Sequence, residues 1–180
     1  MTRDQLEHAI RAACDVADDT ELFVFGSQAI LGEYPDAPPS LRSSIEVDIQ
    51  PVHRVDRVDA IDGALGELSR FHQTYGFYVH GVPIEAATLP DGWQDRTVAV
   101  VHEIGTRGKV GHCVEAHDLA ASKLAAYREK DREFVTALLV EGMIRTDVLA
   151  ERLRSLPVPP DLISKLEGWV RRTARELSGG

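Results

Sequence analysis

Two carboxylates lie two positions apart in the segment SIEVDIQP, residues 44–51. Strict alternation of apolar and polar residues predicts a β-strand, in which side chains i and i+2 leave the same face. Glu46 and Asp48 are therefore expected side by side. The alternating apolar residues face the other way: Ile45, Val47 and Ile49. Such an acidic pair suits Mg²⁺, because an oxygen-seeking cation relieves the repulsion between two like charges. Two ordinary acids on a solvent-facing edge strand are the alternative.

A glycine and a serine interrupt the apolar segment FVFGSQAIL, residues 23–31. Residues 21–25 are expected to form a buried strand and QAIL a short helix. Gly26 lets the backbone approach another group closely, and Ser27 offers a hydroxyl and a helix N-cap. Free N–H groups at a helix start suit a phosphate, although an ordinary tight turn has the same residues. Beside the acidic strand, about 20 residues further on, this turn predicts phosphoryl or nucleotidyl transfer.

Composition limits the partners that the chain can attract. Its 180 residues are 43% hydrophobic and carry a net charge of −9. Residues 1–114 hold 9 Lys/Arg against 18 Asp/Glu, and residues 115–180 hold 11 against 11. A nucleic acid would be repelled at long range and would need a local basic surface in the second half. Two cysteines form no disulfide framework, and no apolar run approaches a membrane span or a signal peptide, so we expect a cytoplasmic protein.

The order of the expected elements indicates an α+β fold. Apolar spacing predicts helices over residues 4–17 and 55–70, and strands over 44–51 and 97–104. The residues 75–81 and 82–89 fit two strands, or one strand and its turn. Further helices are expected over the following ranges: 117–130, 132–142, 146–154 and 160–177. We therefore expect a core domain over residues 1–114 and a helical C-terminal part over 115–180 that packs on it.

The two motifs together resemble a known signature. Gly26-Ser27 followed by Glu46-x-Asp48 resembles the G-S … D-x-D pattern of the DNA polymerase β-like nucleotidyltransferase superfamily. The segment DLAASKLAAYREKDREFVTALL, residues 118–139, is similar to the third motif of the AbiEii/MenT-type nucleotidyltransferase toxins, and PDGWQDR, residues 90–96, also has a counterpart there. The resemblance covers about residues 20–140 and implies the nucleotidyltransferase fold, with a mixed β-sheet core.

The resemblance also implies roles for individual residues. The turn, Gly26 with Ser27, would bind the nucleotide phosphates. Glu46 and Asp48 would bind Mg²⁺, although the first acid of the signature is usually Asp. Lys123 would contact the triphosphate; a lysine that extends from an amphipathic helix into solvent is the alternative.

Each of the other candidate residues has both a functional and a purely structural interpretation. Asp131 matches a later catalytic acid, or it is the N-cap of the next helix. Arg128 and Lys130 would contact phosphates or would solvate a helix end. Glu85 is the candidate for a third carboxylate on a neighbouring strand, or is a surface acid. Ser44 continues the period of two and would share the acidic face, where a phosphate on it would switch the site off; an ordinary strand-start serine is the alternative.

These features lead to one functional hypothesis and two alternatives. The first is a Mg²⁺-dependent nucleotidyltransferase that moves NMP from an NTP to an acceptor. By resemblance the acceptor is the 3′ end of tRNA, and the protein is the toxin of a toxin–antitoxin pair with a cognate antitoxin. The first alternative is a transferase that acts on a small molecule or a protein. The second is a degenerate nucleotidyltransferase domain that only binds, which Glu46 in place of Asp favours.

Overall fold

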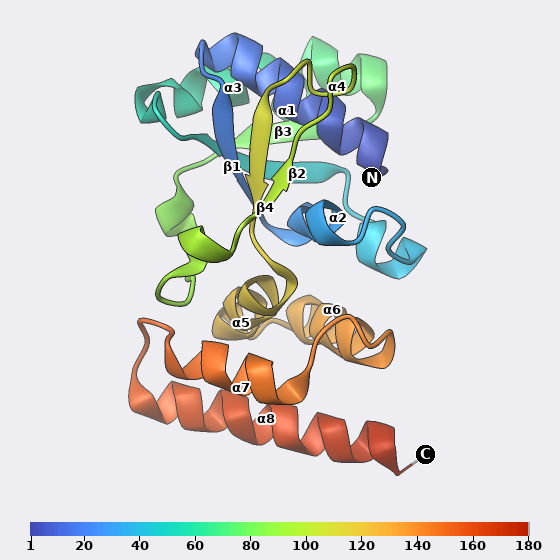
Figure 1. The fold of residues 1–180 in the computed structure, drawn as a ribbon, viewed down its shortest axis with the longest axis vertical. Helices are drawn as coiled ribbons and strands as arrows, with labels where there is room; N and C mark the ends of the chain where they lie inside the picture. Colours follow the sequence, from blue (N-terminus) through green and yellow to red (C-terminus); the bar gives the residue numbers. More distant parts are fainter. Residues whose placement is uncertain (180) are drawn as a thin grey trace. The chain divides into compact units, whose positions relative to one another are not determined.

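A computed structural model describes residues 1–179 of the chain (Figure 1). By their internal contacts the residues form two compact units. The first unit comprises Met1–Ala87 and Arg96–Glu115, and the second comprises Thr88–Asp95 with the chain from Ala116 onward. The first unit is a mixed α and β structure, and the second is helical apart from its short N-terminal segment.

The first unit is built on a five-stranded mixed sheet. Its strands are β1 (Glu21–Phe25), β2 (Glu46–Pro51), β3 (Tyr78–Gly81), β4 (Val98–Val100) and β5 (Val110–Cys113), in the order β3-β2-β1-β5-β4. The pairs β1–β2 and β4–β5 are antiparallel, whereas β2–β3 and β1–β5 are parallel. The expected α+β class with a mixed sheet is confirmed.

Helices α1 (Arg3–Ala17) and α3 (Val58–Leu65) pack against one face of this sheet (Figure 1). Gly111 on β5 lies so close to α1 that an added Cβ would be 2.5 Å from Ile10 Cδ1. The strand residues on this face are fully buried, or nearly so: Leu22, Val24, Val47, Ile49 and Val79. Because strand side chains alternate, Glu46, Asp48, Tyr78 and His80 emerge from the opposite face. Their burial is only partial, so the sheet separates an apolar face from a polar one.

Asp19 connects the end of α1 to the loop after β2. The residue is 6% exposed, and its carboxylate accepts four main-chain N–H bonds, from Thr20 and Glu21 on one oxygen and from His53 and Arg54 on the other. Burial raises the pKa of Asp19, but these hydrogen bonds outweigh that effect and hold the pKa below its usual value. The residue therefore stabilises the end of β2 opposite its acidic end.

The first unit also contains two shorter α-helices, α2 (Ile30–Glu33) and α4 (Arg70–Tyr75).

The second unit contains α5 (Ala116–Ala126), α6 (Glu129–Val140), α7 (Thr146–Arg154) and α8 (Pro160–Ser178). Its core is made of aliphatic side chains from all four: Leu119, Leu124, Val135, Leu138, Leu149, Leu153, Leu166 and Val170. Within the described residues, none of the helices combines the length and the apolar character that a bilayer crossing needs.

Several expected elements are interrupted where the backbone turns. The helix expected over 55–70 is a 3₁₀ turn, Val55–Arg57, followed by α3, which ends at Leu65. The helix ends there because its C-cap, Gly66, is extended, with a ψ of −173°, and Leu68 then adopts a left-handed φ of 64°. The helix expected over 117–130 ends at Ala126, because Tyr127 has a left-handed φ of 51°.

The strand predictions also need correction. The strand expected over 97–104 is limited to Val98–Val100, and β5 was not expected at all. The residues 82–89 do not form a strand but contain a 3₁₀ turn, Ile84–Ala86, so the interpretation as one strand and its turn is the better one. The acidic strand starts at Glu46 instead of residue 44, and Ile45, expected to be buried, is 47% exposed.

Candidate functional site

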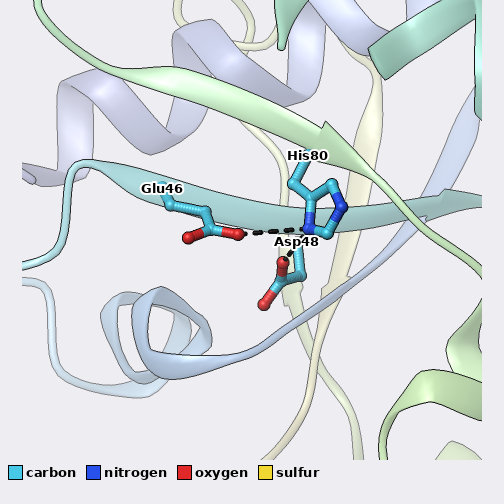
Figure 2. Close-up of side chains that lie close together, drawn as sticks. All are labelled: Glu46, Asp48 and His80. Atoms are coloured by element: carbon cyan, nitrogen blue, oxygen red, sulfur yellow. Dashed lines mark hydrogen bonds and ion pairs between the residues drawn. The ribbon is translucent and has the colours of Figure 1, made fainter. Parts of the chain in front are cut away.

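The parallel pairing of β2 and β3 builds a cluster of three side chains. In this register Glu46 lies opposite Tyr78, and Asp48 lies opposite His80. Figure 2 shows His80 directed at both carboxylates. Its Nδ1 lies 3.1 Å from Glu46 Oε1 and 2.9 Å from Asp48 Oδ1. One ligand atom from each of the three residues lies within 4.8 Å of the others. The predicted carboxylate pair therefore exists on one sheet face, with a histidine added.

The second oxygen of each carboxylate is in contact with the scaffold. The Tyr78 hydroxyl donates to Glu46 Oε2 at 3.1 Å. Burial and this hydrogen bond raise the pKa of Tyr78 to about 12, so the phenol keeps its proton and remains a donor at neutral pH. Asp48 Oδ2 lies against Gly26, where an added Cβ would be only 2.1 Å from it. Both carboxylates are thus oriented with their other oxygen toward His80.

Gly26 is required here by both its neighbour and its backbone. Its φ of 69° and ψ of −174° fall in a region that is essentially restricted to glycine. Phe25, immediately before it, pairs with Asp48 across β1 and β2. The apolar strand stops on a glycine because the Asp48 carboxylate occupies the space that a side chain would need. The close approach expected from the sequence is made to this carboxylate.

The electrostatics of the cluster favour a cation between the side chains. Partial burial lowers the pKa of His80, but its hydrogen bond to Asp48 and the charges of Asp48, Glu46 and Asp62 outweigh burial, so the pKa is raised. The side chains of Glu46, Asp48 and His80 are 39%, 26% and 42% exposed. Two carboxylate oxygens and an imidazole nitrogen are a donor set that fits a divalent metal ion, and their partial exposure leaves room for a substrate.

The turn after β1 differs from the expectation in its helix. Ser27 begins a 3₁₀ turn, Ser27–Ala29, and α2 that follows has only four residues. The N-cap of the turn is Gly26, which offers no side chain, so the expectation that Ser27 caps a helix is wrong. Ser27 is half-buried next to Gly26. Its assignment to the nucleotide phosphates stays a prediction.

Two other predicted residues do not join the cluster as expected. Glu85 is exposed and lies on the 3₁₀ turn Ile84–Ala86, so its expected place on a neighbouring strand is wrong. The neighbouring strand contributes His80 instead. Ser44 precedes β2, and its hydroxyl both accepts from Glu46 N and donates to Glu46 O. The period of two that predicted its direction therefore does not extend to it, and its regulatory role stays a prediction.

The remaining predicted residues belong to the second unit. Asp131 is 1% exposed, and its carboxylate lies 2.6 Å from Arg128 Nε and 3.6 Å from Lys123 Nζ. It is the third residue of α6, and the N-cap is Arg128, so the alternative of Asp131 as an N-cap is wrong. Lys130 is exposed on the same first turn. The roles of these four residues toward a nucleotide stay predictions.

Sequence reasoning missed His80 and Tyr78, although a signal was present. The segment YVHG alternates with the same period as EVD, and it is the next strand along the chain. A parallel pairing of these two short strands brings Tyr78 and His80 onto the face of Glu46 and Asp48. The alternation shows which residues of a strand share a face, but it does not show which strand lies beside it. The contact between His80 and the two acids therefore could not be predicted from the alternation alone.

The fold and the cluster together define the class of protein. A mixed sheet that has helices on one face and clustered acids on the other is consistent with an α+β fold of the nucleotidyltransferase type. The model of a family described as "Nucleotidyltransferase of unknown function (DUF6036)" matches residues 4–158, and the chain belongs to this family. No curated protein and no solved structure gives a significant match. The resemblance to the nucleotidyltransferase superfamily is confirmed at this level, and the resemblance to toxins stays a prediction.

Proposed function

We propose that this protein is a metal-dependent nucleotidyltransferase that transfers NMP from an NTP to an acceptor hydroxyl. One observation carries the proposal: Glu46, Asp48 and His80 converge beside Gly26 in a chain of a nucleotidyltransferase family. The carboxylates would hold the cation, for which Mg²⁺ is the first candidate because its ligands are oxygens. The partial exposure of the cluster is compatible with a bound triphosphate.

The reaction requires a nucleophile, a leaving group and a way to neutralise charge. The acceptor oxygen forms a bond to the α-phosphorus of the NTP, the bond to the bridging oxygen breaks, pyrophosphate leaves, and the hydroxyl proton passes to solvent or a base. When bound, the cation neutralises phosphate charge and lowers the pKa of the attacking hydroxyl. Tyr78 and Gly26 keep the two carboxylates in place. By resemblance, Ser27 and Lys123 would bind the phosphates of the nucleotide, with Arg128 and Lys130 adding positive charge.

The resemblance to toxins supports RNA, and specifically the 3′ end of tRNA, as the acceptor, with a cognate antitoxin as partner. The charge of the chain favours a different acceptor. A net charge of −9, and a second half with 11 basic and 11 acidic residues, give little long-range attraction for RNA. A small molecule or a protein is therefore the second candidate acceptor.

A labelling experiment separates these possibilities. The purified chain is incubated with each of the four α-labelled NTPs, Mg²⁺ or Mn²⁺, and either total RNA or a total metabolite and protein extract. We expect label in an RNA band of tRNA size. Label only in a protein band or a small product would identify the second candidate. Absence of transfer with every donor, metal and acceptor would indicate the degenerate binding domain.

Asp48→Asn tests the metal assignment within the same assay. The substitution keeps the shape of the side chain and removes its charge, so transfer should fall by orders of magnitude while the melting temperature changes little. Asp59→Asn is the matched control, because Asp59 is an exposed acid on α3 outside the cluster. Near-normal transfer by the Asp48→Asn variant would refute the assignment of this residue to the metal.

A further inference from the structure

We propose that His80 is a ligand of the metal, and that its nitrogen makes the site prefer a divalent first-row transition ion over Mg²⁺. The inference rests on the proposed function in one respect, that Glu46 and Asp48 hold a cation. It goes beyond it by assigning a third ligand. Mg²⁺ is the first candidate when only the two carboxylates are counted, and the added nitrogen changes that preference to a transition ion.

The three ligand atoms are oriented toward one another by their neighbours. Glu46 Oε2 accepts from the Tyr78 hydroxyl, and Asp48 Oδ2 packs against Gly26. The other oxygen of each carboxylate faces His80 Nδ1, at 3.1 and 2.9 Å. The chain therefore orients two oxygens and one nitrogen toward a common region. Neighbouring groups that fix ligand orientation in this way are typical of metal sites.

The distances between the three ligand atoms also fit a metal site. For a metal–ligand distance of about 2.1 Å, two ligands at right angles lie roughly 3.0 Å apart. Both separations between His80 Nδ1 and the carboxylate oxygens have this value within 0.1 Å. A hydrogen bond has a similar length, so a His80 that serves only as a counter-ion is the competing interpretation. The two differ in whether the nitrogen binds the metal.

The charge and the chemistry of the donor set fit a divalent transition ion. Two carboxylates and one neutral imidazole contribute two negative charges, which match the charge of one divalent cation. A third carboxylate in place of the imidazole would leave one negative charge in excess. Mg²⁺ prefers oxygen ligands and retains its waters, whereas imidazole is a better ligand for transition ions. Because the three side chains are 26% to 42% exposed, water and phosphate oxygens can fill the remaining positions.

The test uses Mn²⁺ as the probe, because it is paramagnetic and replaces Mg²⁺ readily. Mn²⁺ is titrated into the full chain without nucleotide, and free Mn²⁺ is followed by electron paramagnetic resonance, with Mg²⁺ as competitor. Pulsed measurements on bound Mn²⁺ report directly whether a nitrogen is coordinated. Removing a residue that only hydrogen-bonds to a metal ligand already lowers the metal affinity by about 10–100-fold. Loss of a direct ligand in His80→Ala should therefore weaken Mn²⁺ binding by at least about tenfold.

His80→Asp keeps a third ligand but makes it an oxygen. This variant should still bind metal, lose the nitrogen signal, and show a several-fold smaller preference for Mn²⁺ over Mg²⁺. His112→Gln is the matched control, because the His112 Nε2 to Glu21 Oε2 contact of 2.7 Å is a second histidine–carboxylate pair on the same sheet face. It should retain both the signal and the affinity. Circular dichroism melts confirm that each variant is folded.

The outcomes distinguish the inference from the proposed function. Bound Mn²⁺ with a nitrogen signal that His80→Asp removes supports the inference, even where no transfer is detected. Bound Mn²⁺ without a nitrogen signal overturns it and leaves the proposed function intact. Absence of Mn²⁺ binding, or a nitrogen signal that survives in His80→Asp, also overturns it.

Discussion

Replacing Gly26 by alanine should disable the cluster although none of its three proposed ligand residues is itself substituted. The new Cβ would lie 2.1 Å from Asp48 Oδ2, and ordinary contact begins at 3.4 Å, so the carboxylate would have to move by about 1.3 Å. A reactive group misplaced by 1 Å can cost about 100-fold in rate. The backbone adds a separate cost of about 1–3 kcal/mol, because alanine is strained at a φ of 69°.

The two costs are measured by different assays. Metal affinity and nucleotidyl transfer report the displacement of Asp48. Transfer should fall by about 100-fold, and the metal affinity should fall with it. The melting temperature reports strain, and a loss of 1–3 kcal/mol should lower it by roughly 2–12 °C in a chain of this size.

Gly76→Ala is the matched control for the backbone. Gly76 has a similar φ of 73° but a ψ of 12°, a left-handed conformation in which alanine is strained less than in the region of Gly26, and no atom lies within 4 Å of an added Cβ. This variant should lose stability and keep metal binding. If Gly26→Ala instead binds metal as tightly as the parent chain, Asp48 does not depend on the glycine and the structural argument for this turn is wrong.

Three further predictions concern other parts of the chain. Lys123→Ala should weaken NTP binding with little change in melting temperature, since Arg128 still holds Asp131; a much lower melting temperature with full specific activity would show a structural lysine. Asp19→Asn should lower the free energy of unfolding by about 2–3 kcal/mol at pH 7. Because folding lowers the pKa of Asp19, this difference from the parent chain should be complete above about pH 4 and should shrink as the pH falls further. Denaturant unfolding curves from pH 7 to pH 2 measure it. Ser44→Asp should reduce transfer, and mass spectrometry of the chain co-expressed with its genetic neighbour should find phosphate on Ser44; an unmodified serine and a fully active variant would exclude the switch.

Elements with strong local patterns were predicted well from the sequence. The alternation in residues 44–51 predicted β2 and the shared face of Glu46 and Asp48, which the structure confirms. Residues 146–154 form α7 as expected, and α8 starts at Pro160, where a proline is tolerated in the first turn. In these segments the local preference and the fold agree, so single-sequence reasoning is sufficient.

Only one of the two interruptions had a signal in the sequence. The end of α3 falls on Gly66, a residue type that marks helix ends. Tyr127 adopts a positive φ without being glycine or asparagine, so no residue type predicts the end of α5. Tyr127 is stabilised from elsewhere in the chain: its ring lies 4.0 Å from Lys165 Nζ and 4.9 Å from the Arg132 guanidinium. These contacts come from residues outside α5, so the local pattern of α5 does not contain them.

The third member of the cluster depends on a long-range property, the register between β2 and β3. A slip of one residue would turn Tyr78 and His80 toward α3 and bring their neighbours to the polar face. The buried residues on the same short strand oppose such a slip. Val79 is fully buried, and Gly81 lies so close to α3 that a Cβ would be 2.2 Å from Val58 O. The packing of Val79 and Gly81 against α3 therefore fixes the register of β3. This register in turn places His80 next to the two carboxylates on the opposite face of the sheet.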